Sequence, residues 1–319
     1  MPICYYYNGS DDMKYYIGNF KYYIKKHPKA ICFWMIILIL LSFHTYKNYL
    51  RPIEKNPYID KNSIHYVNDI YQSKGEYYET LLTENEQELY LDMLYDTKHN
   101  KKNRRFTIEE YGCLSASQCN GMIYTVYEAL FIDHPELLSF GVYGFRQKND
   151  TEVEITYKNA IPFKFLVTIH EMRIKRIIDD IKKDTKNLNE YEKVKYVYDW
   201  ISKKTYDKMF TFSAKNQTAY NVFIKDKAVC AGFAKASQII FQNIGIESYI
   251  VLGSTGGYHA WNIVKVNGKY YNFDSTVGSS IRKDSTQFYY GLDGDFENYN
   301  IYNSELYPEP QKEPLKNSF

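Results

Sequence analysis

Three side chains in the second half of the chain have the types and spacing of a nucleophile, a base and a group that orients the base. Cys230 stands in AVCAGFAKASQ, His259 in YHAWNIVKVNG and Asp274 in KYYNFDSTV. A cysteine thiolate attacks a carbonyl carbon, an imidazole transfers the protons, and a carboxylate fixes the orientation of the imidazole. The three residues therefore predict acyl transfer, provided that the fold brings them together.

The segment between the histidine and the aspartate predicts a β-hairpin, because an Asn-Gly at 267–268 joins two alternating stretches. With this pair as the loop, Trp261 lies opposite Asp274. His259 then lies opposite Thr276 and diagonally from Asp274, on the same face and within reach of its carboxylate. The hairpin thus predicts a histidine that an aspartate can orient.

The cysteine is predicted to begin a helix that runs to about Asn243 and is closed by Gly245. At a helix start, unpaired N–H groups and the helix dipole favour a thiolate over a thiol. Gly232 allows a close backbone approach. A lone cysteine is more often a small buried hydrophobe, a lone histidine can cap a strand, and an aspartate can serve a turn. The agreement of three signals within 230–274 favours the catalytic interpretation.

These same segments, with the intervals between them, resemble the transglutaminase-like superfamily in its bacterial, membrane-attached form. The resemblance covers roughly residues 186–295, and YEALFIDHPELLSF resembles the helical region that often precedes this domain. It implies an α+β fold with a papain-like core, in which a helix carrying the cysteine packs on an antiparallel sheet. It implies a Cys230, His259 and Asp274 triad that needs no metal and no cofactor. It also suggests that Trp261 shields the His–Asp pair and that Tyr220 helps to bind the oxyanion.

An uncharged apolar run near the N-terminus, AICFWMIILILLSF from Ala30 to Phe43, predicts a membrane segment. Its long lysine-containing head and the absence of a cleavage signal favour an uncleaved transmembrane anchor at 30–46, although a span needs about 20 residues. By the positive-inside rule, residues 1–29 are expected in the cytoplasm and the catalytic domain outside the cell, on a single-pass membrane protein. A buried core helix is the alternative.

The rest of the chain divides by composition and pattern. We expect a linker at 47–75, a mainly helical region with a hairpin at 76–185, the transglutaminase-like domain at 186–300 and a polar tail at 301–319. Thr83 and Glu86 form a capping box at the start of one helix. QFYYGL at 287–292 is a further strand candidate.

Composition excludes some classes of partner. The chain has 40 basic and 38 acidic residues and a net charge of +2, which gives no reason to expect nucleic acid. Its five cysteines match no zinc pattern. Cys113 and Cys119 could form a disulfide or remain free thiols, and the oligomeric state cannot be deduced.

The sequence therefore predicts a membrane-anchored cysteine enzyme that acts on amide bonds of a protein or peptide through a thioester. Hydrolysis is somewhat favoured over transfer to an amine, which would crosslink proteins, because excluding water requires a specialised pocket. The alternative is a non-catalytic cell-surface binding or scaffolding module with the same fold. An intact triad argues against that alternative.

Overall fold

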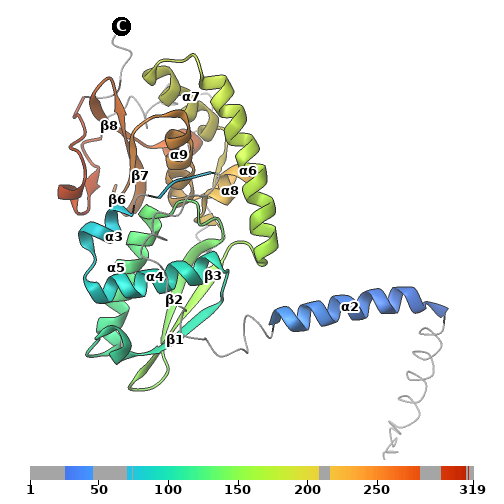
Figure 1. Cartoon of the computed structure of the whole chain (residues 1–319). Helices are drawn as coiled ribbons and strands as arrows, with labels where there is room; N and C mark the ends of the chain where they lie inside the picture. The colour runs from blue at the N-terminus through green and yellow to red at the C-terminus, as the bar shows by residue number, and fades with distance from the viewer. Residues whose placement is uncertain are drawn as a thin grey trace, which may run out of the picture. The chain divides into compact units, whose positions relative to one another are not determined.

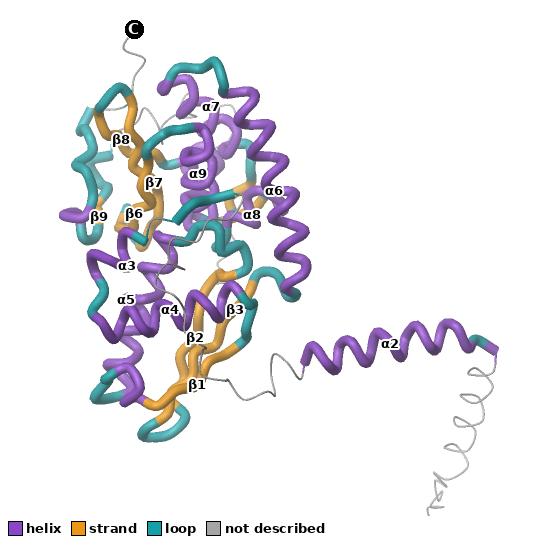
Figure 2. Tube along the Cα trace, in the orientation of Figure 1, coloured by secondary structure: helices purple, strands orange, loops and turns teal. Residues whose placement is uncertain are grey.

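The computed structural model describes residues 26–45, 70–73, 75–207, 216–280, 296–313 and 315 of the 319-residue chain. The chain divides into two units, Met1–Pro52 and Ile53–Phe319, which are described separately. The second unit contains the candidate site and is shown with its labelled elements in Figure 1 and by secondary structure in Figure 2.

The apolar run near the N-terminus forms a helix, α2, over Pro28–Thr45. Among the residues that the structure describes, however, no helix is both long and apolar enough to cross a membrane. The transmembrane helix predicted at 30–46 is therefore not supported. The unbroken apolar stretch Ala30–Phe43 is shorter than the roughly 20 residues that a span needs. Most of the predicted N-terminal segment 1–29 and of the linker 47–75 lies outside the described residues.

The first half of the larger unit combines helices with a three-stranded antiparallel sheet. These elements are α3 (Glu76–Leu81), α4 (Glu84–Lys98), β1 (Asn103–Thr107), α5 (Ala116–Asp133), β2 (Phe140–Gln147) and β3 (Glu152–Asn159), with the strand order β1-β3-β2. The predicted hairpin, β2 with β3, is confirmed. So is the capping box, in which Thr83 and Glu86 each satisfy the other's backbone N–H. The additional strand β1 is not evident from the sequence.

A disulfide joins Cys113 to Cys119, whose Cα atoms lie 5.5 Å apart, a usual separation for such a bond. It connects the turn after a 3₁₀ helix, η3 (Ile108–Tyr111), to the first turns of α5. Both cysteines are buried. Of the two states that the sequence allows for this pair, the structure has the disulfide.

The second half of the larger unit is built around one central helix, α9 (Cys230–Ile244). It lies between strands β6 and β7 on one side and helices α6 and α7 on the other (Figure 1), and it also contacts α8. The surrounding helices are α6 (Lys164–Thr185), α7 (Glu190–Ser202), α8 (Ala219–Lys225) and α10 (Ser275–Ser280). The helix ends as predicted at Gly245, which has a φ of 76° that favours glycine. Most of its side chains are buried, so its position is strongly fixed.

The sheet beside α9 has four antiparallel strands in the order β8-β7-β6-β9. They are β6 (Ser248–Ser254), β7 (Tyr258–Val266), β8 (Lys269–Phe273) and β9 (Asn300–Ile301), and two short strands elsewhere, β4 (Thr205–Tyr206) and β5 (Lys227–Ala228), pair in parallel. The predicted register of the hairpin is confirmed from Val266–Lys269 to Asn262–Phe273. Its loop residues, Asn267 and Gly268, both have positive φ, as a tight hairpin turn requires.

The hairpin is shorter than the sequence predicts. Strand β8 stops at Phe273 and the chain turns into α10 at Ser275, so Trp261 and His259 do not form strand pairs with Asp274 and Thr276. Polar side chains instead connect the sheet to α9. The Asn262 side chain donates to the Ala234 carbonyl at 3.1 Å, and Gln238 donates to the Ser248 carbonyl at 2.8 Å.

The C-terminal segment packs on the domain. Strand β9 pairs with the end of β6, a short 3₁₀ helix, η5 (Ser304–Leu306), follows, and the Gln311 N–H donates to the Tyr270 carbonyl. Residues 301–313 therefore extend the sheet side of the domain, where the sequence predicts only a polar tail. The strand candidate at 287–292 lies outside the described residues.

Gly253, on β6, pairs with Ile301 of this segment. A Cβ there would lie 2.5 Å from the Trp261 ring and closer still to the Asn300 carbonyl oxygen. We expect Gly253→Ala to lower the free energy of unfolding by about 1–3 kcal/mol, because neither neighbour can withdraw easily. Urea denaturation of the full chain measures this. Gly257→Ala is the matched control, since a Cβ there meets nothing within 4 Å; equal losses for the two variants would contradict the packing described.

Candidate active site

Cys230 occupies the first position of α9 and is half-buried. The residue before it, Val229, provides no side-chain cap, so backbone N–H groups of the first turn are not covered by a capping side chain. Gly232 is needed for packing, because a Cβ there would lie 2.8 Å from Ala228 Cβ and 2.9 Å from the Thr218 carbonyl oxygen. The helix start is therefore held closely against its neighbours, while Cys230 as a whole remains partly exposed.

His259, near the beginning of β7, lies against a buried carboxylate. Its Nε2 is 2.8 Å from Oδ2 of Asp274, which is only 2% exposed. Asp274 also accepts hydrogen bonds from the Thr276 backbone N–H and hydroxyl and from the Tyr299 hydroxyl, the last at 2.7 Å. Burial alone would raise the pKa of Asp274, but the charge and hydrogen bond of His259, with the bonds from Thr276 and Tyr299, hold it below its usual range.

The imidazole is stabilised in its charged form from two sides. Burial lowers the pKa of His259, but the hydrogen bond and charge of Asp274, followed by the hydrogen bond and charge of Cys230, raise it to about 10. Because Nε2 is bonded to Asp274, Nδ1 is the ring nitrogen left for Cys230. The structure therefore brings together the three predicted residues in the order sulfur, imidazole and carboxylate.

Trp261 lies two residues further along β7, on the same face as His259. Its ring is stacked on the imidazole, with centroids 5.7 Å apart and planes 21° apart, and its N–H donates to Asn272 Oδ1 at 2.9 Å. Tyr299 packs edge-on against both rings. The indole and the tyrosine thus both pack against the imidazole, and the shielding role expected of Trp261 stays a prediction.

Residues 177–275 match the family model of the transglutaminase-like superfamily, and this range includes all three residues of the triad. These residues are a transglutaminase-like domain. The match begins within α6, before the boundary at 186 that the sequence suggests. No curated protein is found to match the chain.

Two solved structures show a weaker likeness to the chain. One is described as the crystal structure of a TGase, with 19% identity, a TM-score of 0.29 and coverage of 47% of this chain and 48% of that one. The other is described as a "Putative Cysteine Protease from Cytophaga hutchinsonii", with 16% identity, a TM-score of 0.29 and coverage of 41% and 55%. The chain thus spans about half the length of each, and at these TM-scores the likeness says nothing further about this chain.

Within the described part of the chain, no contact joins Tyr220 to a residue of the triad. It lies on α8, where its ring packs against His170 with centroids 4.7 Å apart and lies under the Lys225 ammonium. The role in oxyanion binding that the family resemblance suggests for Tyr220 therefore stays a prediction without support from its contacts.

Two tyrosines that the sequence does not single out lie at the site of the transglutaminase-like domain. Tyr299 donates to Asp274 from the segment before β9. Tyr206, on β4, pairs with Ala228 two residues before the nucleophile, and burial followed by the charges of Cys230 and Asp274 raises its pKa to about 12. Both are placed by two-residue strands, which are too short to produce a recognisable sequence pattern.

An aromatic side chain from the region before the transglutaminase-like domain packs beside the start of α9. Phe131 of α5 belongs to one buried cluster with Ala231 and Ala234 of α9 and with residues of β6 and β7. The Lys235 ammonium lies 4.1 Å from the centre of the Phe131 ring, and burial lowers its pKa to about 7 against the opposing charge of Glu136. Residues 76–185 are thus in direct contact with the helix that carries Cys230.

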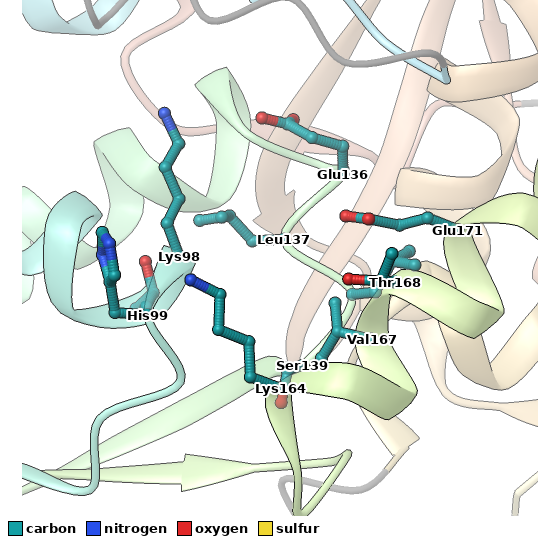
Figure 3. A pocket seen from close by; sticks show the side chains of 11 residues that line it. Lys98, His99, Glu136, Leu137, Ser139, Lys164, Val167, Thr168 and Glu171 are labelled. Atoms are coloured by element: carbon teal, nitrogen blue, oxygen red, sulfur yellow. The ribbon is translucent and has the colours of Figure 1, made fainter. Parts of the chain in front are cut away.

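A pocket of about 300 Å³ lies elsewhere, between the end of α4, the loop after α5 and the first turns of α6 (Figure 3). Lys98 and Lys164 line it together with Glu136 and Glu171. None of its lining residues belongs to α9, β7 or β8, so this pocket is not part of the triad's surroundings. Among the described residues, no group of histidine, cysteine, aspartate or glutamate side chains is arranged to hold a metal ion.

The charged state of His259 gives a direct prediction. Because its pKa is raised from 6.5 to about 10, the stability that its charge provides is complete below pH 6.5 and is lost as the pH rises through 10. NMR of the protein with labelled histidine should show a His259 ring that remains protonated at pH 8. Asp274→Asn removes the largest stabilising partner and should move the titration to lower pH. A wild-type ring that titrates near 6.5 would show that the pair is not formed.

Proposed function

We propose that the chain is a cysteine acyltransferase that acts on amide bonds of a protein or peptide, with Cys230 as nucleophile, His259 as acid and base, and Asp274 as the orienting group. The single observation that carries this proposal is the imidazole held between the buried carboxylate and the thiol. A histidine that served only to cap a strand would not need the buried Asp274 carboxylate beside it, which accepts hydrogen bonds from four donor groups.

The reaction follows from this arrangement. The Cys230 thiolate attacks the amide carbon, and the charged oxygen that develops is stabilised by backbone N–H groups at the uncapped start of α9. As the intermediate collapses, the carbon–nitrogen bond breaks, a thioester forms on sulfur, and the proton on Nδ1 of His259 passes to the departing amine. The neutral imidazole then takes a proton from the second nucleophile, and the thiolate is regenerated when the acyl group leaves.

We propose water as the more frequent second nucleophile, so that the reaction is hydrolysis of a peptide or side-chain amide. Cys230 is only half-buried and the side chain of His259 is 13% exposed, so water can reach both groups. Transfer to an amine uses the same three residues and differs only in the molecule that attacks the thioester.

The proposal predicts an unusually reactive thiol. Iodoacetamide should alkylate Cys230 of the full chain faster than it alkylates an unfolded cysteine peptide, and His259→Ala should slow the reaction about tenfold or more, because an ordinary thiol is only a few per cent thiolate at pH 7. Peptide mapping by mass spectrometry assigns the labelled site. His99→Ala is the control, since it removes a histidine from the end of α4, outside the triad. Labelling of Cys230 no faster than that of the peptide would favour a non-catalytic binding module.

A further inference from the structure

A cluster of three tyrosines and one glutamate lies on the surface beside His259. Tyr124 and Glu128 come from α5, Tyr258 from the start of β7 and Tyr302 from the segment after β9. The Tyr258 hydroxyl lies 3.5 Å from Glu128 Oε1, and the Tyr258 and Tyr302 ring centroids are 6.2 Å apart. The three tyrosines are 46%, 56% and 40% exposed, in the order Tyr124, Tyr258, Tyr302. We call these four residues the tyrosine–glutamate cluster.

The cluster is connected to the site from two directions. Tyr258 immediately precedes His259 on β7, so the two Cα atoms are about 3.8 Å apart. On α5, Glu128 lies one turn before Phe131. Phe131 packs in a buried hydrophobic group with Ala231, the residue that follows the nucleophile. The tyrosine–glutamate cluster therefore lies near the start of α9, on the side covered by α5.

The charge of the cluster comes from Glu128. Glu128 is half-buried, and in the part of the chain that the structure describes no lysine or arginine forms an ion pair with it. The pKa of Glu128 is raised above its usual value by burial, and hydrogen bonds donated by the hydroxyls of Tyr124 and Tyr258 oppose this shift only in part. A carboxylate among exposed aromatic rings attracts a cation both by its charge and through the ring faces.

We propose that the tyrosine–glutamate cluster binds a cationic side chain, of lysine or arginine, in a peptide substrate bound at the active site. This inference rests on the proposed function and adds the substrate class to it. The carboxylate of Glu128 supplies the charge, and Tyr124, Tyr258 and Tyr302 supply the ring surfaces. The cluster thereby selects basic peptides and disfavours acidic ones.

Matched peptides test the proposal. A peptide that the full chain cleaves is prepared with lysine, and separately with uncharged norleucine, at each of the two positions on either side of the reacting amide. At one of these positions, kcat/KM should be roughly tenfold higher for lysine, the size of a partly desolvated cation–π and ion-pair interaction. In Glu128→Gln this ratio should fall close to one, and in Glu128→Lys it should invert. In Glu88→Gln, which removes the same charge from an exposed position on α4, the ratio should remain that of the wild type.

A lysine preference that is absent in the wild type, or that survives Glu128→Gln, would overturn the proposal. Binding provides a readout that does not depend on turnover: calorimetry with the Cys230→Ala chain should show tighter binding of the lysine peptide than of the norleucine peptide, and Glu128→Gln should abolish the difference. A chain that cleaves no peptide but retains this difference would contradict the proposed function while leaving the cationic site in place. Equal binding of the two peptides would overturn the site itself.

Discussion

The buried carboxylate of Asp274 is the constraint around which the candidate site is organised. An ionised carboxylate with 2% exposure is costly unless donors surround it. Here the donors come from three parts of the chain: His259 on β7, Thr276 in the first turn of α10, and Tyr299 in the C-terminal segment. The early end of β8 and the pairing of β9 both serve to complete this set. The imidazole is charged because the carboxylate behind it is charged.

The thiol is positioned by a separate set of interactions. Helix α9 is buried on most of its surface, its start packs without room for a side chain at Gly232, and Asn262 and Gln238 connect it to the sheet that carries His259. The region before the transglutaminase-like domain adds Phe131 on the remaining side. The nucleophile and its base therefore meet through tertiary packing of a helix against a sheet.

Local sequence patterns predict the parts of this site that local rules determine. An Asn-Gly loop determines the hairpin register as far as Phe273. The helical periodicity, which ends at Gly245, defines a helix whose first residue is Cys230. The strand predicted beyond Phe273 is absent, because Asp274 leaves the sheet to accept the bonds of Thr276. Tyr299 could not be predicted, since it joins Asp274 from 25 residues away beside a two-residue strand. Tyr220 illustrates the converse: the family resemblance suggests a role in oxyanion binding, while its ring packs on His170.

The formation of a covalent intermediate on Cys230 tests the central claim most directly. The full chain is mixed with an activated peptide ester, quenched within seconds, and examined by intact-protein mass spectrometry and peptide mapping. The account predicts a mass increase equal to the acyl group, located on Cys230, absent in Cys230→Ala and formed more slowly in Asp274→Ala. The absence of an adduct at this sulfur, or formation that does not depend on Asp274, would contradict it.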